Sequence, residues 1–174
     1  MIIEKDRLMR NKAGFTLIEL VIVIVILGIL TVTAAPKFLN ISSDTYRAKL
    51  HELKGSMTEI SRIIYGKAVM QSDENDITGS KKVEGIAIWN GYPKGNYAGI
   101  GKTIVDLQDN WAANQDTSIS NQPGYRTYVM TFMKKVSKSE SDSVEKIKAT
   151  NCYLSYKENN TGDEPIITII DSGC

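Results

Sequence analysis

The strongest pattern in the chain is an uninterrupted apolar run near the N-terminus. From Leu20 to Leu30 every residue is apolar or glycine. Between Phe15 and Pro36 the only charged residue is Glu19. A helix of about 21 residues, rising about 1.5 Å per residue, is about 32 Å long, close to the hydrocarbon core of a bilayer. The run is therefore predicted to be a helix that can span a membrane.

The carboxylate of Glu19 is unusual in such a segment. An acidic residue at the centre of a membrane helix is disfavoured by about 2.5–3.5 kcal/mol on insertion scales. Ionisable residues that persist inside membranes usually have a specific partner and a function. Glu19 is therefore a candidate functional residue whose partner has to be found.

After Pro36 the pattern becomes amphipathic. Apolar residues recur at spacings of three and four, which defines one stripe along a helix. The stripe consists of Tyr46, Leu50, Leu53, Met57, Ile60 and Ile64. The helix is predicted to run to about Met70, so that it has about 55 residues and a length of about 80 Å. Because this exceeds any small domain, we expect the first half to protrude and the half after Pro36 to pack on the downstream chain.

Four downstream segments are rich in strand-forming residues. They are Val83–Trp89, Tyr128–Met133, Cys152–Tyr156 and Ile166–Ile170. Their connections suit an antiparallel meander, one face of which can cover the amphipathic helix. The predicted class is α+β, with a long N-terminal helix packed on a four-stranded antiparallel sheet.

The segments between these strands are predicted to be mostly loops. Polar residues over 71–82, 137–142 and 157–164 indicate surface connections. The exception is a short surface helix ending near Asp109, because Ile100, Ile104 and Leu107 have helical spacing.

Charge changes the picture only at the N-terminus. The 174 residues carry a formal net charge of +1, so no overall field indicates a nucleic-acid partner. Before the apolar run, basic residues outnumber acidic ones. These are Lys5, Arg7, Arg10 and Lys12 against Glu4 and Asp6. A basic flank stays in the cytoplasm, so the chain after Pro36 should lie on the far side of the membrane.

An ordinary secretory signal peptide is the alternative for the N-terminus. Thr33-Ala34-Ala35 could serve as a small-residue cleavage site. Two features oppose this interpretation. The apolar region begins with Gly-Phe-Thr-Leu-Ile-Glu, which includes polar residues, and Pro36 directly follows the supposed cleavage site.

No arrangement of residues predicts catalysis or a cofactor. Asp73, Asn75 and Asp76 lack the glycine and glutamate of an EF-hand loop in register. The segment Gly99–Thr103 resembles the end of a phosphate-binding loop but lacks its upstream glycine. His51 is the only histidine, which excludes most Ser-His and Cys-His schemes. We expect no enzyme activity, no cofactor and no metal site.

The two cysteines, Cys152 and Cys174, favour a disulfide if the domain lies outside the cytoplasm. Such a bond would close a loop of about 23 residues and stabilise the fold by about 3 kcal/mol in the chain-entropy model. A free-thiol or metal-binding role is the alternative, but it lacks partner residues.

The segment Lys12-Ala13-Gly14-Phe15-Thr16-Leu17-Ile18-Glu19-Leu20 resembles the type IV pilin signature. The short leader and the phenylalanine look like the type IVa branch, although Glu4 and Asp6 make this leader less purely basic than most. The resemblance implies that a prepilin peptidase in the inner membrane cuts between Gly14 and Phe15. It also implies that the same enzyme methylates the new N-terminus at Phe15.

The resemblance also supplies a partner for Glu19. In a bundle of such helices, Glu19 of one subunit can neutralise the Phe15 ammonium group of the next, because the new α-amino group is mostly protonated at neutral pH. The partner is thus another copy of the chain in a helical filament. A carboxylate that stays protonated or reaches the headgroups is the alternative.

Gly28 and Pro36 bound the weakest part of the helix. Glycine costs about 1 kcal/mol and proline about 3 kcal/mol in a helix interior. In related filaments the corresponding region is melted or extended, so we expect a helix in the membrane and local unfolding on assembly. A simple proline kink is the alternative.

The C-terminal end carries a second likeness. A segment bounded by Cys152 and Cys174 resembles the D-region of type IV pilins. Together with Gly28–Leu30, Thr33–Asn40 and the Ser172-Gly173-Cys174 ending, it looks like the mannose-sensitive haemagglutinin (MSHA) pilin group.

This likeness implies a leader at residues 1–14, a transmembrane and filament-core half of the helix at 15–36, and an amphipathic half at 37–70. A globular head at 71–174 follows, ending in the cysteine-bounded region 152–174. The expected function is that of a structural subunit, the major pilin of a surface filament used for attachment. Such a subunit is held in the bacterial inner membrane before the pilus assembly machinery moves it into an extracellular pilus. A minor pilin, a type II secretion pseudopilin and a membrane-anchored binding module that never polymerises are the alternatives.

Overall fold

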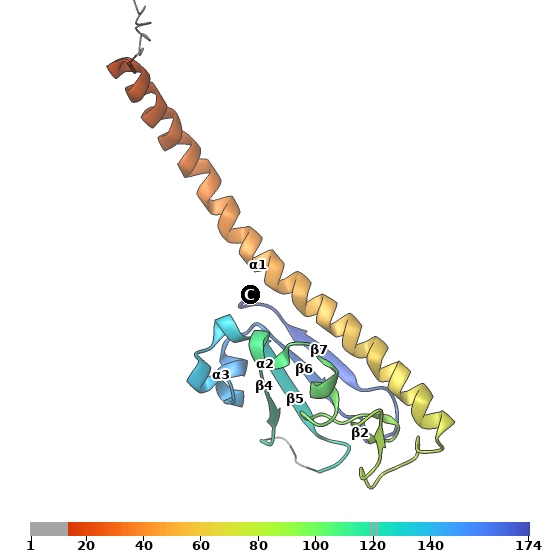
Figure 1. The fold of residues 1–174 in the computed structure, drawn as a ribbon. Coiled ribbons are helices and arrows are strands. Elements are labelled where there is room, and N and C mark those ends of the chain that lie inside the picture. The colour runs from red at the N-terminus through yellow and green to blue at the C-terminus, as the bar shows by residue number, and fades with distance from the viewer. Residues whose placement is uncertain (1–13, 119, 121) are drawn as a thin grey trace, which may run out of the picture. The chain divides into compact units, whose positions relative to one another are not determined.

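The structure of the protein, a computed structural model, describes residues 14–118, 120 and 122–174, and the side chains of all of these except residues 35–40 and 138. The chain divides into two compact units, residues 1–41 and residues 42–174. We refer to the second as the C-terminal unit. Figure 1 shows the order of the elements along the chain.

The long helix is present and ends where the sequence predicts. Helix α1 spans Leu17–Met70, a length of 54 residues. Within the C-terminal unit its buried face consists of Leu50, Leu53, Met57 and Ile64, none of them more than 9% exposed. The remaining stripe residues, Tyr46 and Ile60, are partly buried against the same cores. The predicted stripe is confirmed.

The main sheet has four antiparallel strands in chain order, β4-β5-β6-β7. The strands are β4 (Trp111–Asp116), β5 (Thr127–Phe132), β6 (Tyr153–Lys157) and β7 (Ile166–Ile170). Strand β5 is buried along its whole length because it lies inside the sheet, between β4 and β6. The α+β class with a four-stranded antiparallel sheet is confirmed.

One of the predicted strands lies outside this sheet. Ile86–Trp89 forms β2 of a separate three-stranded sheet, between β1 (Lys82–Val83) and β3 (Tyr92–Pro93). The fourth strand of the main sheet is instead Trp111–Asp116, which the sequence did not predict. The cause is local, since β2 is joined to both neighbours by two-residue turns. The turns Glu84-Gly85 and Asn90-Gly91 have positive φ at both positions, as type I′ hairpins require.

Short helical turns fill the connections. The predicted helix from Ile100 to Asp109 is two pieces, η1 (Ile100–Thr103) and α2 (Leu107–Asn110). Asp106, with φ 53°, has left-handed backbone and starts the second piece afresh. The sequence also did not predict α3 (Val144–Ala149), where Ser143 is the N-cap and accepts a hydrogen bond from Lys146 N. The turns η2 (Met133–Lys135) and η3 (Lys138–Glu140) precede it.

The core of the C-terminal unit lies on both faces of the main sheet. On one face, alternate residues of β5 and β6 pack against α1. They are Tyr128, Met130, Phe132, Leu154 and Tyr156, in contact with Leu50, Leu53 and Met57. On the other face, Ile147 of α3 packs on Ala112 and Val129. The prediction that one sheet face covers the amphipathic helix is consistent with this packing.

Candidate processing and assembly site

The predicted cleavage bond lies in a short non-helical segment directly before α1. Gly14, Phe15 and Thr16 are exposed, and none of them is in a helix or strand. Phe15 is 84% exposed. The bond from Gly14 to Phe15 is therefore accessible to a peptidase. The rest of the predicted leader lies outside the described residues.

Glu19 has an intrachain partner that the sequence interpretation missed. Its Oε2 atom accepts hydrogen bonds from Thr16 N and Thr16 Oγ1, both at 2.8 Å. Thr16 Oγ1 in turn accepts a bond from Glu19 N at 3.3 Å. Threonine before the first helical residue and glutamate three positions later form a capping box, which satisfies otherwise unpaired N–H groups at the helix start. The Thr-Leu-Ile-Glu sequence was the available signal.

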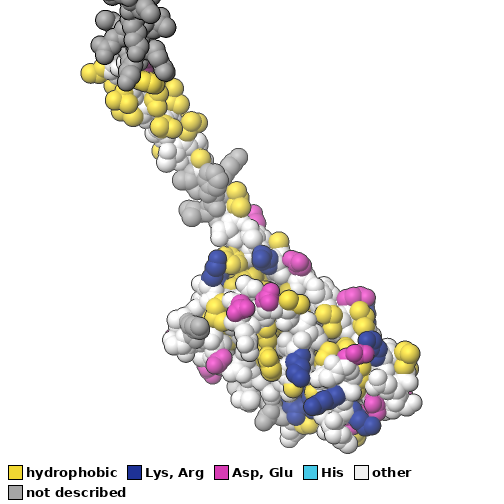
Figure 2. All heavy atoms as spheres, in the orientation of Figure 1, with side chains coloured by type: hydrophobic (Ala, Val, Ile, Leu, Met, Phe, Trp, Pro, Cys, Tyr) yellow, Lys and Arg dark blue, Asp and Glu magenta, His cyan; other side chains and the backbone are white. Residues whose placement is uncertain are grey.

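The apolar part of α1 is exposed on every side. The segment Leu17–Ala34 is long and apolar enough to cross a membrane, and none of it is buried inside the structure. In Figure 2, hydrophobic side chains gather along this part of the helix on the visible face. Such a surface calls for lipid or for other apolar helices around it.

Helix α1 continues through both Gly28 and Pro36. A Cβ atom added at Gly28 would meet nothing within 4 Å. Between these two residues, Thr31 Oγ1 donates to Leu27 O at 2.7 Å and Thr33 Oγ1 donates to Leu30 O at 3.0 Å. The hydroxyl groups are thus satisfied within the helix, as an apolar surrounding demands. Local unfolding in this region stays a prediction.

Cys152 and Cys174 form the disulfide that the cysteine count favoured. Their Cα atoms are 4.8 Å apart and the residues are separated by 22 positions. Cys152 directly precedes β6 and is fully buried, while Cys174 ends the chain after β7. The bond therefore attaches the segment after β7 to the start of β6. Lys135 Nζ adds a hydrogen bond to Gly173 O at 2.9 Å.

A buried carboxylate, Glu158, joins three segments of the C-terminal unit. It lies just after β6 and its side chain is 2% exposed. Its two oxygens accept hydrogen bonds from Gly95 N at 2.8 Å and from Gly124 N at 2.6 Å. The Arg126 guanidinium lies 3.8 Å away. Glu158 thus holds the loops after β3 and before β5 against the sheet.

Asp116, at the end of β4, is a second buried carboxylate, with a side chain 1% exposed. It accepts hydrogen bonds from Lys148 Nζ, Ser118 N and Ser118 Oγ. Burial raises the pKa of Asp116, but these hydrogen bonds outweigh it and hold the pKa below its ordinary value. Asp116 therefore binds α3, through Lys148, to the edge of the sheet.

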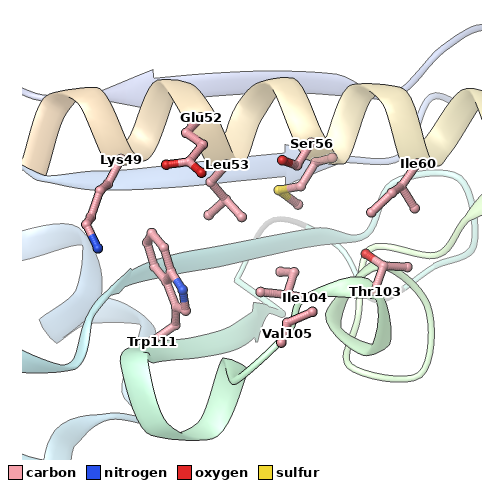
Figure 3. A pocket seen from close by; sticks show the side chains of 10 residues that line it. Lys49, Glu52, Leu53, Ser56, Ile60, Thr103, Ile104, Val105 and Trp111 are labelled. Carbon is pink, nitrogen blue, oxygen red and sulfur yellow. The ribbon is translucent and has the colours of Figure 1, made fainter.

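A surface groove lies between α1 and the segment from η1 to β4. Its volume is about 420 Å³, and Figure 3 shows Leu53 and Ile60 facing Ile104 and Trp111 across it. Among the described residues that line it, only Lys49 and Glu52 are charged. Within the described residues, no group of three or more His, Cys, Asp and Glu side chains could hold a metal ion.

Comparison with protein families gives one match, which covers residues 9–35. The matching family is the prokaryotic N-terminal methylation motif. No curated protein and no solved structure matches the chain. The match covers the predicted cleavage bond, Glu19 and the whole apolar segment Leu17–Ala34 of α1. It implies processing by a prepilin peptidase and assembly of the pilus type. It supports a type IV pilin-like protein of the prepilin type, such as a pilus or pseudopilus subunit, and proteins of this family are structural rather than enzymatic.

Proposed function

We propose that the protein is the major structural subunit of a type IV pilus and polymerises through the apolar part of α1. One observation carries this proposal: the methylation motif leads directly into a helix whose apolar surface is exposed along Leu17–Ala34. In a membrane the surface is covered by lipid. In a filament it is covered by the same surface of neighbouring copies, so that one segment serves both states.

Processing is proposed to occur at the bond between Gly14 and Phe15, followed by methylation of the Phe15 amine. The exposure of this non-helical segment supports this assignment. Cleavage leaves Thr16 and Glu19 on the mature chain, so the capping box that begins α1 survives it.

Glu19 is proposed to neutralise the Phe15 ammonium group of a neighbouring subunit. The capping box occupies Oε2, and Oε1 has no hydrogen bond within the described chain. One carboxylate can thus cap its own helix and accept a bond from a second chain, because each carboxylate oxygen accepts independently. This extends the earlier expectation, in which the neighbouring amine was the only partner.

Substitution of Glu19 tests the proposed pairing. Glu19→Gln keeps the shape of the side chain but removes its charge, so we expect normal membrane insertion and few or no filaments. The matched control is Glu59→Gln, an exposed glutamate of α1 in the C-terminal unit, which should assemble at wild-type yield. Filament yield comes from sheared surface fractions, and insertion from membrane fractionation. Wild-type filament yield in Glu19→Gln would exclude the pairing.

The nature of the filament is tested by analysis of sheared surface material. We expect long filaments whose main subunit begins at methylated Phe15 and lacks two hydrogens because of the Cys152–Cys174 bond. The disulfide is the feature that favours a pilin over a type II secretion pseudopilin. A chain found only in small amounts beside another main subunit would indicate a minor pilin. A chain found only in inner-membrane fractions would contradict the proposal.

Membership of the MSHA group and a role in surface attachment are parts of the same proposal. They rest on the residues around Gly28 and Pro36 and on the cysteine-bounded C-terminus. Deletion of the coding gene should abolish both the filaments and the attachment of cells to surfaces. Attachment that survives the loss of the filaments would contradict the adhesive role.

A further inference from the structure

The two edges of the main sheet differ in how they are protected. At the β4 edge, α2 and α3 lie against the strand, and Asn114 Nδ2 donates to Asp142 O at 2.6 Å. At the other edge, β7 pairs with β6 on one side only. Apart from its pairing with β6, the backbone of Ile166–Ile170 makes no hydrogen bond with the described part of the chain. Strand β7 therefore presents an open edge.

The composition of β7 lacks the features that keep an edge strand from pairing with another strand. Its sequence, Ile-Ile-Thr-Ile-Ile, contains no charge and no proline. Ile166 is 53% exposed, and Thr168 on the same face is exposed as well. Ile167 and Ile169 pack against the core but are only partly buried. An apolar strand with free N–H and C=O groups is a template for another strand.

The sequence of β7 indicates which strand fits it, because it reads the same in both directions. If two copies of β7 pair antiparallel about Thr168, each Thr168 lies opposite its own counterpart, and every isoleucine lies opposite an isoleucine. Both Thr–Thr and β-branched pairs are favourable across strands. A strand that complements itself under a two-fold rotation is suited to an isologous contact between identical chains.

Charges at the ends of β7 do not oppose this contact. Two acidic residues, Glu164 and Asp171, flank the strand. In the proposed pairing, Glu164 of one copy would lie near Asp171 of the other. Each has a basic partner on α1 in its own chain, since Arg62 Nε lies 2.9 Å from Glu164 Oε1 and Arg47 Nε lies 3.9 Å from Asp171 Oδ2. The disulfide after β7 also fixes the strand, so little order has to be gained on pairing.

We propose that β7 is a strand-pairing interface through which two copies of this chain associate, with Ile166–Ile170 antiparallel and Thr168 at the two-fold axis. The contact closes on itself and cannot propagate a filament. It is therefore separate from polymerisation through α1.

Cysteine cross-linking of the full chain in detergent micelles tests the register. In Thr168→Cys the two new thiols face each other, so mild oxidation should give a covalent dimer. In Ile166→Cys, on the same strand and face, the thiols of two copies are offset by four residues, about 13 Å. This exceeds the reach of a disulfide. A mixture of Ile166→Cys and Ile170→Cys chains should restore the cross-link. The intact mass should show that the Cys152–Cys174 bond is retained.

Sedimentation of the same full chain without added cysteines tests the association itself. We expect a wild-type dimer at micromolar concentration and a monomer in Thr168→Lys, because like charges placed directly opposite each other destabilise a strand pair. Thr117→Lys, at an exposed residue just after β4, is the matched control and should remain dimeric. Cross-linking of Thr168→Cys no faster than that of Ile166→Cys would overturn the proposal. A monomeric wild-type chain, or a dimeric Thr168→Lys chain, would overturn it too.

Discussion

Single polar residues hold the C-terminal unit together at points that apolar packing does not reach. Glu158 binds two backbone N–H groups and lies near Arg126, while Asp116 binds Lys148 and Ser118. The sequence could not reveal these contacts, because the partners of Glu158 lie 32 or more positions before it and no local pattern relates them. Thr16 and Glu19 are the opposite case, since their spacing of three is a recognisable capping signal.

Replacement of Glu158 should destabilise the C-terminal unit strongly. Glu158→Gln leaves the largely buried Arg126 without its counter-charge and offers an amide NH₂ to one of the two glycine N–H groups. Removing one member of a buried pair costs about 3 kcal/mol. Unfolding of the full chain in mild detergent, followed by the fluorescence of Trp89 and Trp111, measures the loss. The exposed Glu164→Gln is the control, and a similar loss there would contradict this role of burial.

Asp116 should make the stability depend on acid pH. Its folded-state pKa is lowered by hydrogen bonds from Lys148 and Ser118, against the effect of burial. A lowered pKa contributes stability that is present above the unfolded-state value of about 3.9 and is lost as the pH falls through the folded-state value. Asp116→Asn should be less stable at pH 5 and should lose less stability between pH 5 and pH 2.5. Equal losses in both proteins would contradict the prediction.

At the scale of elements, hydrophobic periodicity predicted the long helix correctly, but the sequence did not predict correctly which strands make up the main sheet. The α1 stripe, its end at Met70 and three of the main-sheet strands agree with the sequence pattern. Strand β4 was not predicted from the sequence, because Trp-Ala-Ala-Asn-Gln-Asp has few strand-forming residues. It becomes a strand through pairing with β5 and packing against α3. Conversely, the strand formers of β2 are confined by their two tight turns to a small sheet of their own.

The start of α1 should depend on its capping box. Thr16→Ala removes the side-chain acceptor for Glu19 N and a donor to the carboxylate. Loss of a threonine N-cap costs about 1 kcal/mol, so amide protection in the first turn should fall by about fivefold. Hydrogen exchange of the full chain in micelles measures this. Thr31→Ala, which removes only a bond to Leu27 O inside the helix, should leave the first turn unchanged. Equal effects of the two changes would exclude the cap.

The segment between Gly28 and Pro36 should become harder to unfold after Gly28→Ala. The added methyl group meets nothing within 4 Å and replaces glycine with the best helix former, a gain of about 1 kcal/mol. If assembly requires local unfolding here, the variant should insert normally but give fewer filaments. Gly55→Ala, at another open glycine of α1, is the matched control. Unchanged filament yield in Gly28→Ala, with slowed hydrogen exchange in the segment, would exclude a need for unfolding.

At the scale of the whole molecule, the two units differ in what stabilises them. The described part of residues 1–41 has an apolar segment with no buried part, so its surroundings must supply the burial. Residues 42–174 have their own cores and a disulfide. The sequence predicted both properties, because a long apolar run and an even cysteine count are composition signals. It did not predict the open β7 edge, which depends on which strand ends the sheet.

Removal of the disulfide should therefore affect one unit only. The double variant Cys152→Ser with Cys174→Ser frees the segment after β7, and the loss expected from the chain-entropy model is about 3 kcal/mol. Unfolding in detergent should show a lower midpoint for the tryptophan signal of the C-terminal unit. The same midpoint should appear in the wild type after reduction, and the variant should not respond to reductant. Hydrogen exchange over Leu17–Ala34 should stay unchanged, because lipid or detergent rather than the sheet stabilises that helix. Faster exchange there would show that the two units depend on each other.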